Sequence, residues 1–192
     1  MVITLLLMVG CSQHGRIETD GRAESMPGSA SNSEIEVQLY QQALLFLDNN
    51  ELDKAEPILR TFSLKHPELA GPWANLGLIQ LKRGNMDNAE GFLKEALTKN
   101  PKLPQAFNQL GVIEQNRGNA LQAEQLYLQA IKENNDYAIA HYNIALLYDI
   151  YLQEIDKAIS HYESYLELSD YKDQQTINWL KQLKSIREKS SR

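Results

Sequence analysis

Apolar and small residues recur along the chain with a fixed period of 34 residues. Residues 73–77 read WANLG and residues 107–111 read FNQLG, while residues 83–85 and 117–119 both read RGN. Two copies separated by one constant interval of this length indicate a repeat protein. The apolar positions within each copy have helical spacing and are interrupted once, which predicts two helices joined by a turn.

The period extends in both directions from these two copies. Matching positions hold small residues or prolines: Ala43, Gly77, Gly111 and Ala145; Ala55, Ala89 and Ala123; Pro67 and Pro101. We therefore predict repeats at residues 36–69, 70–103, 104–137 and 138–172. The last repeat contains one extra residue near residues 152–154, which moves its matching alanine to Ala158, and its turn lacks the usual glycine.

Local signals agree with this division into helices. Glycines 84 and 118, each followed by asparagine, predict a left-handed turn between paired helices. Three pairs of residues have the spacing of capping boxes at helix starts: Ser33 with Glu36, Asp53 with Glu56, and Asp87 with Glu90. Residues 171–189 have apolar side chains at helical spacing, which predicts an amphipathic helix covering the last repeat.

The 34-residue unit, with its aromatic, Leu-Gly, alanine and proline positions, resembles the tetratricopeptide repeat (TPR) family. The resemblance covers residues 36–172 and implies an all-α fold: a right-handed superhelical stack of about four helix-turn-helix units with a C-terminal capping helix. In this pattern Gly77, Gly111 and Ala145 let one helix approach its partner closely. Ala89 and Ala123 lie on the other side of that contact.

The N-terminus has a different character. Residues 1–10 are apolar apart from Thr4, too short to span a bilayer, and directly followed by the only cysteine, Cys11. This arrangement resembles a bacterial lipoprotein signal peptide (residues 1–10) with Cys11 as the lipid-attachment residue. It departs from that pattern at Met8, where leucine is usual, and in having no Lys or Arg before the apolar run. The alternative is an incidental apolar N-terminus with a free thiol.

Residues 11–32 are rich in serine, glycine and small polar residues, so we expect them to form a flexible tether between the lipid and a TPR domain at residues 33–189. Ser12 follows the cysteine, where an aspartate would favour the inner membrane. By resemblance to enterobacterial sorting rules, the expected location is the periplasmic face of the bacterial outer membrane.

The composition argues against several other functions. A net charge of −6 gives no support to nucleic-acid binding. The four histidines show no metal-ligand spacing, no glycine-rich loop suits a phosphate, and no nucleophile is paired with a base. We therefore expect no catalytic residues, metal or cofactor, and a protein or extended peptide segment as the partner.

In TPR proteins the first helix of each repeat lines a concave groove. The resemblance assigns these residues to it: Tyr40, Gln41, Leu44, Leu47, Asn75, Leu78, Lys82, Asn108, Gln109, Val112, Gln115, Ile139, Tyr142, Asn143, Leu146 and Asp149. One row holds only carboxamides (Gln41, Asn75, Gln109 and Asn143), which both donate and accept hydrogen bonds and so suit a peptide backbone. The alternative is that asparagine is simply common at this position in bacterial repeats.

Two further features bear on the partner. The carboxylate clamp of chaperone-binding relatives needs cations at a position that here holds Val37, Gly71, Gln105 and Ile139, so we do not expect that clamp. Seven of the nine tyrosines lie from Tyr137 onward. Tyr148 and Tyr162 occupy core positions of the repeat. The remaining candidates for an aromatic partner site are Tyr142, Tyr151 and Tyr165, together with Trp179.

Taken together, these patterns predict a membrane-anchored TPR scaffold that binds a protein partner through its groove. Among lipoproteins of this architecture it is similar to the pilotin-type proteins that help assemble type IV or tight-adherence pilus secretins. Two alternatives stay open: an adaptor of peptidoglycan hydrolases, or a soluble cytosolic TPR adaptor or chaperone if the lipid-attachment sequence is fortuitous.

Overall fold

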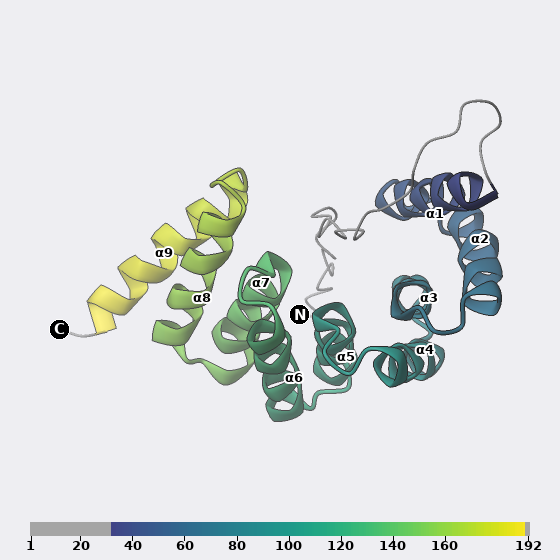
Figure 1. The fold of residues 1–192 in the computed structure, drawn as a ribbon. Helices are drawn as coiled ribbons and strands as arrows, with labels where there is room; N and C mark the ends of the chain where they lie inside the picture. The colour runs from purple at the N-terminus through teal and green to yellow at the C-terminus, as the bar shows by residue number, and fades with distance from the viewer. Residues whose placement is uncertain (1–31, 191–192) are drawn as a thin grey trace. The chain divides into compact units, whose positions relative to one another are not determined.

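The structure, a computed structural model, describes residues 32–190 (Figure 1). The predicted signal peptide, Cys11 and the tether as far as residue 31 lie outside the described residues. All regular structure in the described range is helical: α1 (Asn32–Asp48), α2 (Leu52–Lys65), α3 (Ala70–Lys82), α4 (Met86–Lys99), α5 (Pro104–Asn116), α6 (Ala120–Glu133), α7 (Ala138–Leu146), the π-helix η1 (Leu147–Leu152), α8 (Ile155–Leu168) and α9 (Gln174–Ser190). The predicted all-α class is confirmed.

The chain divides into two compact units, one ending at Pro67 and one beginning at Glu68. In the first unit α1 packs against α2, and the two alanines predicted from the period, Ala43 and Ala55, are fully buried between the helices. The Tyr40 ring lies 5.0 Å from that of Phe62. The described part of this unit is therefore a single helix-turn-helix pair with buried alanines at its contact.

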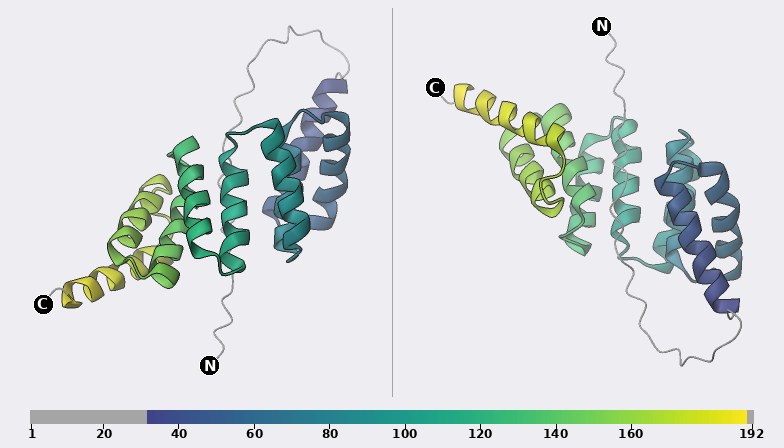
Figure 2. Two further views of the ribbon diagram at one scale, coloured as in Figure 1. Left: turned by 90° about the horizontal axis from the view of Figure 1, so that it is seen from below. Right: turned by 90° about the horizontal axis from the view of Figure 1, so that it is seen from above.

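The second unit is a stack of helix pairs that follow one another along the chain (Figures 1 and 2). Helix α3 packs against α4, α5 against α6, and α7 against α8, and each pair contacts the next through α4 with α5 and α6 with α7. The first helices also touch one another, α3 with α5 and α5 with α7. Side chains on these three helices consequently share one face of the unit.

Two glycines allow the paired helices to approach closely, as predicted. A Cβ atom added at Gly77 would lie 2.8 Å from Cδ2 of Leu93, and one added at Gly111 would lie 2.5 Å from Cε1 of Tyr127. Both distances are far below a normal van der Waals separation of about 3.5–4.0 Å. In the second and third repeats glycine occupies this position because the second helix places a large side chain directly against the first.

The turns between paired helices are left-handed in the described repeats. Gly84 and Gly118 have φ values of 79° and 83°, as the sequence predicted. In the fourth repeat the extra residue is absorbed by the π-helix η1, after which Gln153 takes the left-handed conformation with φ of 56°. The bond from Glu154 N to Tyr148 O, 2.9 Å long, closes this irregular segment.

The predicted capping boxes are wrong. Helices α2 and α4 begin after Glu51 and Asn85, and neither residue makes a side-chain capping bond. Ser33 lies inside α1, which begins one residue earlier. The glutamates of these pairs instead bind cations: Glu36 binds Lys65 and His66, Glu56 binds Arg60, and Glu90 binds Lys94 and Arg117.

Helix α9 packs against α8, the last helix of the fourth repeat, which is the capping role predicted for residues 171–189. It begins at Gln174, later than predicted, because Asp170 and Tyr171 have positive φ angles and Asp173 caps the first turn by accepting from Thr176 N at 3.0 Å. Its residues Leu180 and Leu183 are buried in the core that α7 and α8 share. Within residues 32–190, no helix has the length and apolar character required to cross a bilayer.

Candidate functional site

The first helices of the second unit bring several predicted groove residues together. Asn143 on α7 donates from Nδ2 to Oδ1 of Asn108 on α5 over 2.9 Å, so two carboxamides from adjacent repeats are joined directly. Asn108 is buried, whereas Asn143 keeps part of its surface exposed. The other two polar atoms of these side chains, Nδ2 of Asn108 and Oδ1 of Asn143, take part in no hydrogen bond with the described residues.

Gln109, the next residue on α5, is also buried, and its Oε1 atom has no hydrogen-bond partner among the described residues. The same holds for Oε1 of Gln105, one helical turn earlier. A buried acceptor without a donor costs about 1–3 kcal/mol. Each of these two oxygen atoms on α5 would therefore be stabilised by a hydrogen-bond donor. At the level of the sequence, Gln105 served only as an argument against a carboxylate clamp. No sequence pattern indicated that the Oε1 atom of this partly exposed residue is buried.

An apolar strip accompanies the carboxamides. Leu78, Val112 and Leu146 are each partly exposed, and the last two also pack against the core of the unit. Asn75 on α3 is likewise partly buried. The site therefore combines hydrogen-bonding groups with apolar surface on α3, α5 and α7, which is a suitable surface for an extended peptide. Binding by these residues stays a prediction.

Other residues predicted for the groove have different surroundings. In the first unit Gln41 is exposed, Leu44 is partly buried, and Leu47 belongs to the core. In the second unit, Gln115 accepts a hydrogen bond of 2.8 Å from the buried hydroxyl of Tyr127. The prediction for Leu47 is wrong because this side chain is buried in the core of the helix pair rather than exposed on its surface.

The aromatic candidates near the C-terminus separate into two groups. Tyr148 and Tyr162 are buried, which confirms their predicted place in the core. The rings of Tyr142 and Tyr165 lie 5.0 Å apart. Tyr151 is exposed on η1 and makes no ring contact with either of them in the described structure.

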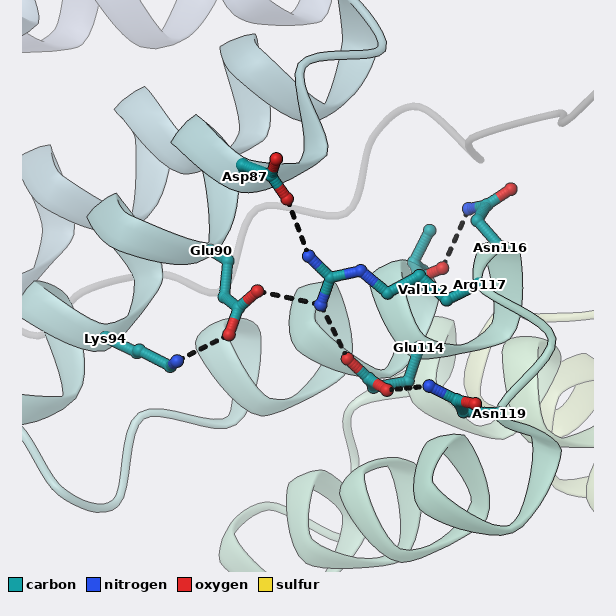
Figure 3. Close-up of polar contacts among 8 residues, drawn as sticks. All are labelled: Asp87, Glu90, Lys94, Val112, Glu114, Asn116, Arg117 and Asn119. Atoms are coloured by element: carbon teal, nitrogen blue, oxygen red, sulfur yellow. Dashed lines mark hydrogen bonds and ion pairs between the residues drawn. The ribbon is translucent and has the colours of Figure 1, made fainter.

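An ion-pair network fixes α4 of one repeat to α5 of the next (Figure 3). The guanidinium of Arg117, at the end of α5, lies 2.7 Å from Oε2 of Glu90 and 2.9 Å from Oδ1 of Asp87. It also contacts Oε1 of Glu114 at 2.9 Å. Hydrogen bonds from Lys94 and then Arg117 lower the pKa of Glu90. This network helps to hold neighbouring repeats in the arrangement that places their first helices side by side.

A pair of histidines links α7 to α8. The Nδ1 atoms of His141 and His161 lie 3.1 Å apart, and Nε2 of His141 lies 3.0 Å from the carbonyl oxygen of Asn135. Because a carbonyl only accepts, Nε2 of His141 carries the proton, and Nδ1 of His161 donates to Nδ1 of His141. Burial lowers the pKa of both residues, that of His161 to about 4, so both are neutral near pH 7.

Among residues 32–190 there is no group of three or more His, Cys, Asp or Glu side chains arranged to hold a metal ion.

The stacked helix pairs define a helical-repeat protein. The surface shared by their first helices, part polar and part apolar, suggests a protein-binding scaffold. The sequence matches the tetratricopeptide repeat family over residues 40–104 and 108–173, more than half of the chain. The protein therefore belongs to the tetratricopeptide repeat family. Among curated proteins, none matches this chain.

Several solved structures are similar to the fold. PilF of Pseudomonas aeruginosa has a TM-score of 0.69 and 18% identity, over 82% of this chain and 71% of its own. A thermophilic TPR protein of Thermus thermophilus has a TM-score of 0.65 and 21% identity, over 79% and 82%. The first TPR of Spaghetti (RPAP3), bound to the HSP90 peptide SRMEEVD, has a TM-score of 0.57 and 20% identity, over 62% and 95%. At identities this low, the structural similarity shows a shared fold alone.

Proposed function

We propose that this protein is a lipid-anchored scaffold that holds an extended segment of a protein partner against α3, α5 and α7. It assists the assembly of an envelope machine such as a type IV or tight-adherence pilus or its secretin. The anchor is Cys11, and the expected location is the periplasmic face of the bacterial outer membrane. Family membership supports the scaffold role, and the likeness to PilF supports the link to pili.

The observation that carries the groove proposal is the bond between Asn143 and Asn108. This bond uses one N–H of Asn143 and leaves the second N–H and the carbonyl oxygen of this partly exposed side chain for a ligand. An extended peptide presents alternating C=O and N–H groups, so the pair is able to bind a backbone on both counts. The partly exposed Val112 and Leu146 provide apolar contact beside it.

The experiment begins with identification of the partner in envelope preparations. A photo-crosslinking residue replaces Val112 in the groove, and in a matched control it replaces the exposed Lys132 on α6. We expect an envelope protein to crosslink from the groove position only. Crosslinking to a secretin supports the pilus assignment, and crosslinking to a different envelope protein overturns that assignment while leaving the groove in place.

The second stage measures affinity for that partner. Asn108→Ala combined with Asn143→Ala removes both members of the carboxamide pair, so no orphaned group is left in the fold. Loss of hydrogen bonds at a desolvated interface costs about 1–3 kcal/mol, so binding weakens tenfold or more, whereas Lys132→Ala has no effect. Unchanged affinity in the double variant, with a normal melting temperature, would rule out this groove as the binding site.

A further inference from the structure

Three aromatic side chains and two carboxylates gather where α7, η1, α8 and α9 meet. We call Tyr142, Tyr165, Trp179, Asp149 and Asp173 the aromatic-acidic cluster. The Tyr142 and Tyr165 rings lie 5.0 Å apart and are tilted by 55°. Nε1 of Trp179 donates to Oδ2 of Asp149 over 2.7 Å, and the Tyr165 hydroxyl donates to Oδ2 of Asp173 over 3.2 Å.

The two ends of this cluster are joined through the core. The buried Tyr162 donates its hydroxyl to Oδ2 of Asp149 over 3.3 Å, and its ring meets the Tyr142 ring edge-on at 6.2 Å. A continuous chain of contacts therefore runs from Asp149 through the tyrosine rings to Asp173. Trp179 remains 43% exposed, so an aromatic surface is accessible beside the carboxylates.

Neither carboxylate is paired with a cation in the described structure. Asp149 binds only an indole N–H and a hydroxyl, and Asp173 binds Tyr165 and the backbone and hydroxyl of Thr176. Three cations of the C-terminal region form ion pairs with other carboxylates: Lys172 with Asp170, Lys184 with Glu163, and Arg187 with Asp156. Asparagine in place of Asp149 can accept both bonds at its single carbonyl oxygen, because Oδ2 alone accepts them in the structure. Asparagine in place of Asp173 keeps the cap on Thr176 N, but its Nδ2 atom cannot accept from the Tyr165 and Thr176 hydroxyls as Oδ2 does.

The placement of Asp149 is specific to the fourth repeat. It lies in η1, the π-helical segment that absorbs the extra residue, and it reaches α9 thirty residues further along the chain. Single-turn π-helical segments are rare and are frequently found at functional sites. The irregular turn thus places a charged group against the indole of Trp179 on α9.

We propose that the aromatic-acidic cluster binds a basic side chain of the partner protein, with arginine favoured over lysine. The face of an aromatic ring attracts a cation, and two uncompensated carboxylates strengthen that attraction. The planar guanidinium both stacks on rings and donates to carboxylates, which an ammonium group does less well. The proposal rests on the proposed function only in that the ligand belongs to a protein segment.

The test uses two acetylated and amidated pentapeptides, Gly-Ser-Arg-Ser-Gly and its counterpart with norleucine in place of arginine. Each is titrated against the full-length protein while the indole N–H resonance of Trp179 is followed by NMR. The indole resonance of Trp73, on α3, is the internal control. We expect the arginine peptide to shift the Trp179 signal at millimolar concentration and the norleucine peptide to leave it unchanged.

Charge-neutralising variants then test the carboxylates. Asp149→Asn should weaken binding of the arginine peptide about threefold to tenfold at an unchanged melting temperature. Asp173→Asn should weaken it to a similar extent, and its melting temperature is measured separately because it also loses acceptors for two hydroxyls. Asp170→Asn, which removes a neighbouring charge already paired with Lys172, should have no effect. Equal shifts from both peptides, no shift from either, or no effect of the asparagine variants would each overturn the proposal. The pentapeptide does not need the groove in order to bind the aromatic-acidic cluster. A result against the groove proposal therefore leaves the outcome of this test unaffected.

Discussion

Replacement of Gly111 by alanine tests the close helix contact at the centre of the second unit. The new Cβ would lie 2.5 Å from Cε1 and 2.7 Å from Cδ1 of Tyr127. That ring is almost completely buried, and its hydroxyl is held by a 2.8 Å hydrogen bond to Gln115. The ring therefore has to move by about 1 Å to reach a normal contact distance, and this movement disturbs both its packing and its hydrogen bond.

The expected cost follows from two opposing effects. Overpacking a well-packed core costs about 1–3 kcal/mol, while alanine in place of glycine within a helix stabilises by roughly 1 kcal/mol. Because the obstructing group is a rigid ring and not the end of a flexible chain, we expect net destabilisation of about 1–2 kcal/mol. For a domain of this size, that corresponds to a decrease in melting temperature of about 2–8 °C.

Two other glycines provide matched controls. Gly91 lies in α4 with no atom within 4 Å of its added Cβ, so Gly91→Ala should stabilise by up to about 1 kcal/mol. The Cβ added at Gly77 would lie 2.8 Å from both Cγ and Cδ2 of Leu93, an aliphatic side chain that can change rotamer more readily than a tyrosine ring, so Gly77→Ala should fall between the other two variants. The order of the three variants thus depends on the packing partner and not on glycine itself.

The assay is thermal and urea denaturation of the three variants beside the unchanged protein. Amide hydrogen exchange adds a spatial readout, because damage in a linear stack of repeats is concentrated near the substituted repeat. If Gly111→Ala is as stable as Gly91→Ala, the ring of Tyr127 does not obstruct this position, and the close contact is not what selects glycine there.

Two further predictions concern pH and the anchor. Burial lowers the pKa values of His141 and His161 in the folded state. The unfolded state therefore binds more protons below pH 6.5, so the contribution of these neutral histidines to folding stability is complete above pH 6.5 and is lost as the pH falls towards 4. Because His161 keeps some contact with solvent, we expect a loss of about 1–2 kcal/mol. Denaturation at pH 7 and pH 4.5 should show a smaller difference in His161→Gln, and an equal difference would contradict the assignment. Cys11→Ser should release the protein from membranes in a fractionation experiment, whereas recovery of the unprocessed, unsubstituted protein in the soluble cytosolic fraction would refute the lipid anchor.

The sequence by itself determined the repeat architecture. A 34-residue period recurs because every repeat has to dock on its neighbours through the same surface, so the packing requirement is written once in each copy. For this reason the small residue at Gly111, the left-handed turns at Gly84 and Gly118, and the amphipathic helix that covers the last pair were all predictable. The family resemblance also predicted that the first helix of each repeat carries the groove residues, and binding by those on α3, α5 and α7 stays a prediction.

Only the tertiary structure decided how polar side chains are paired. Asp87 and Glu90 have the local spacing of a helix cap, yet α4 begins after Asn85, so Asp87 lies inside the first turn and both side chains bind Arg117 of the next repeat. The burial of Asn108 and its bond to Asn143 depend on the separation of α5 and α7.

The contact between Asp149 and Trp179 likewise joins residues thirty positions apart, and it requires a π-helical turn that the sequence showed only as one extra residue. A short-range pattern records which surfaces of a helix are apolar. The partner of each charge or amide is set by distances across helices, and those distances exist only once the repeats have packed.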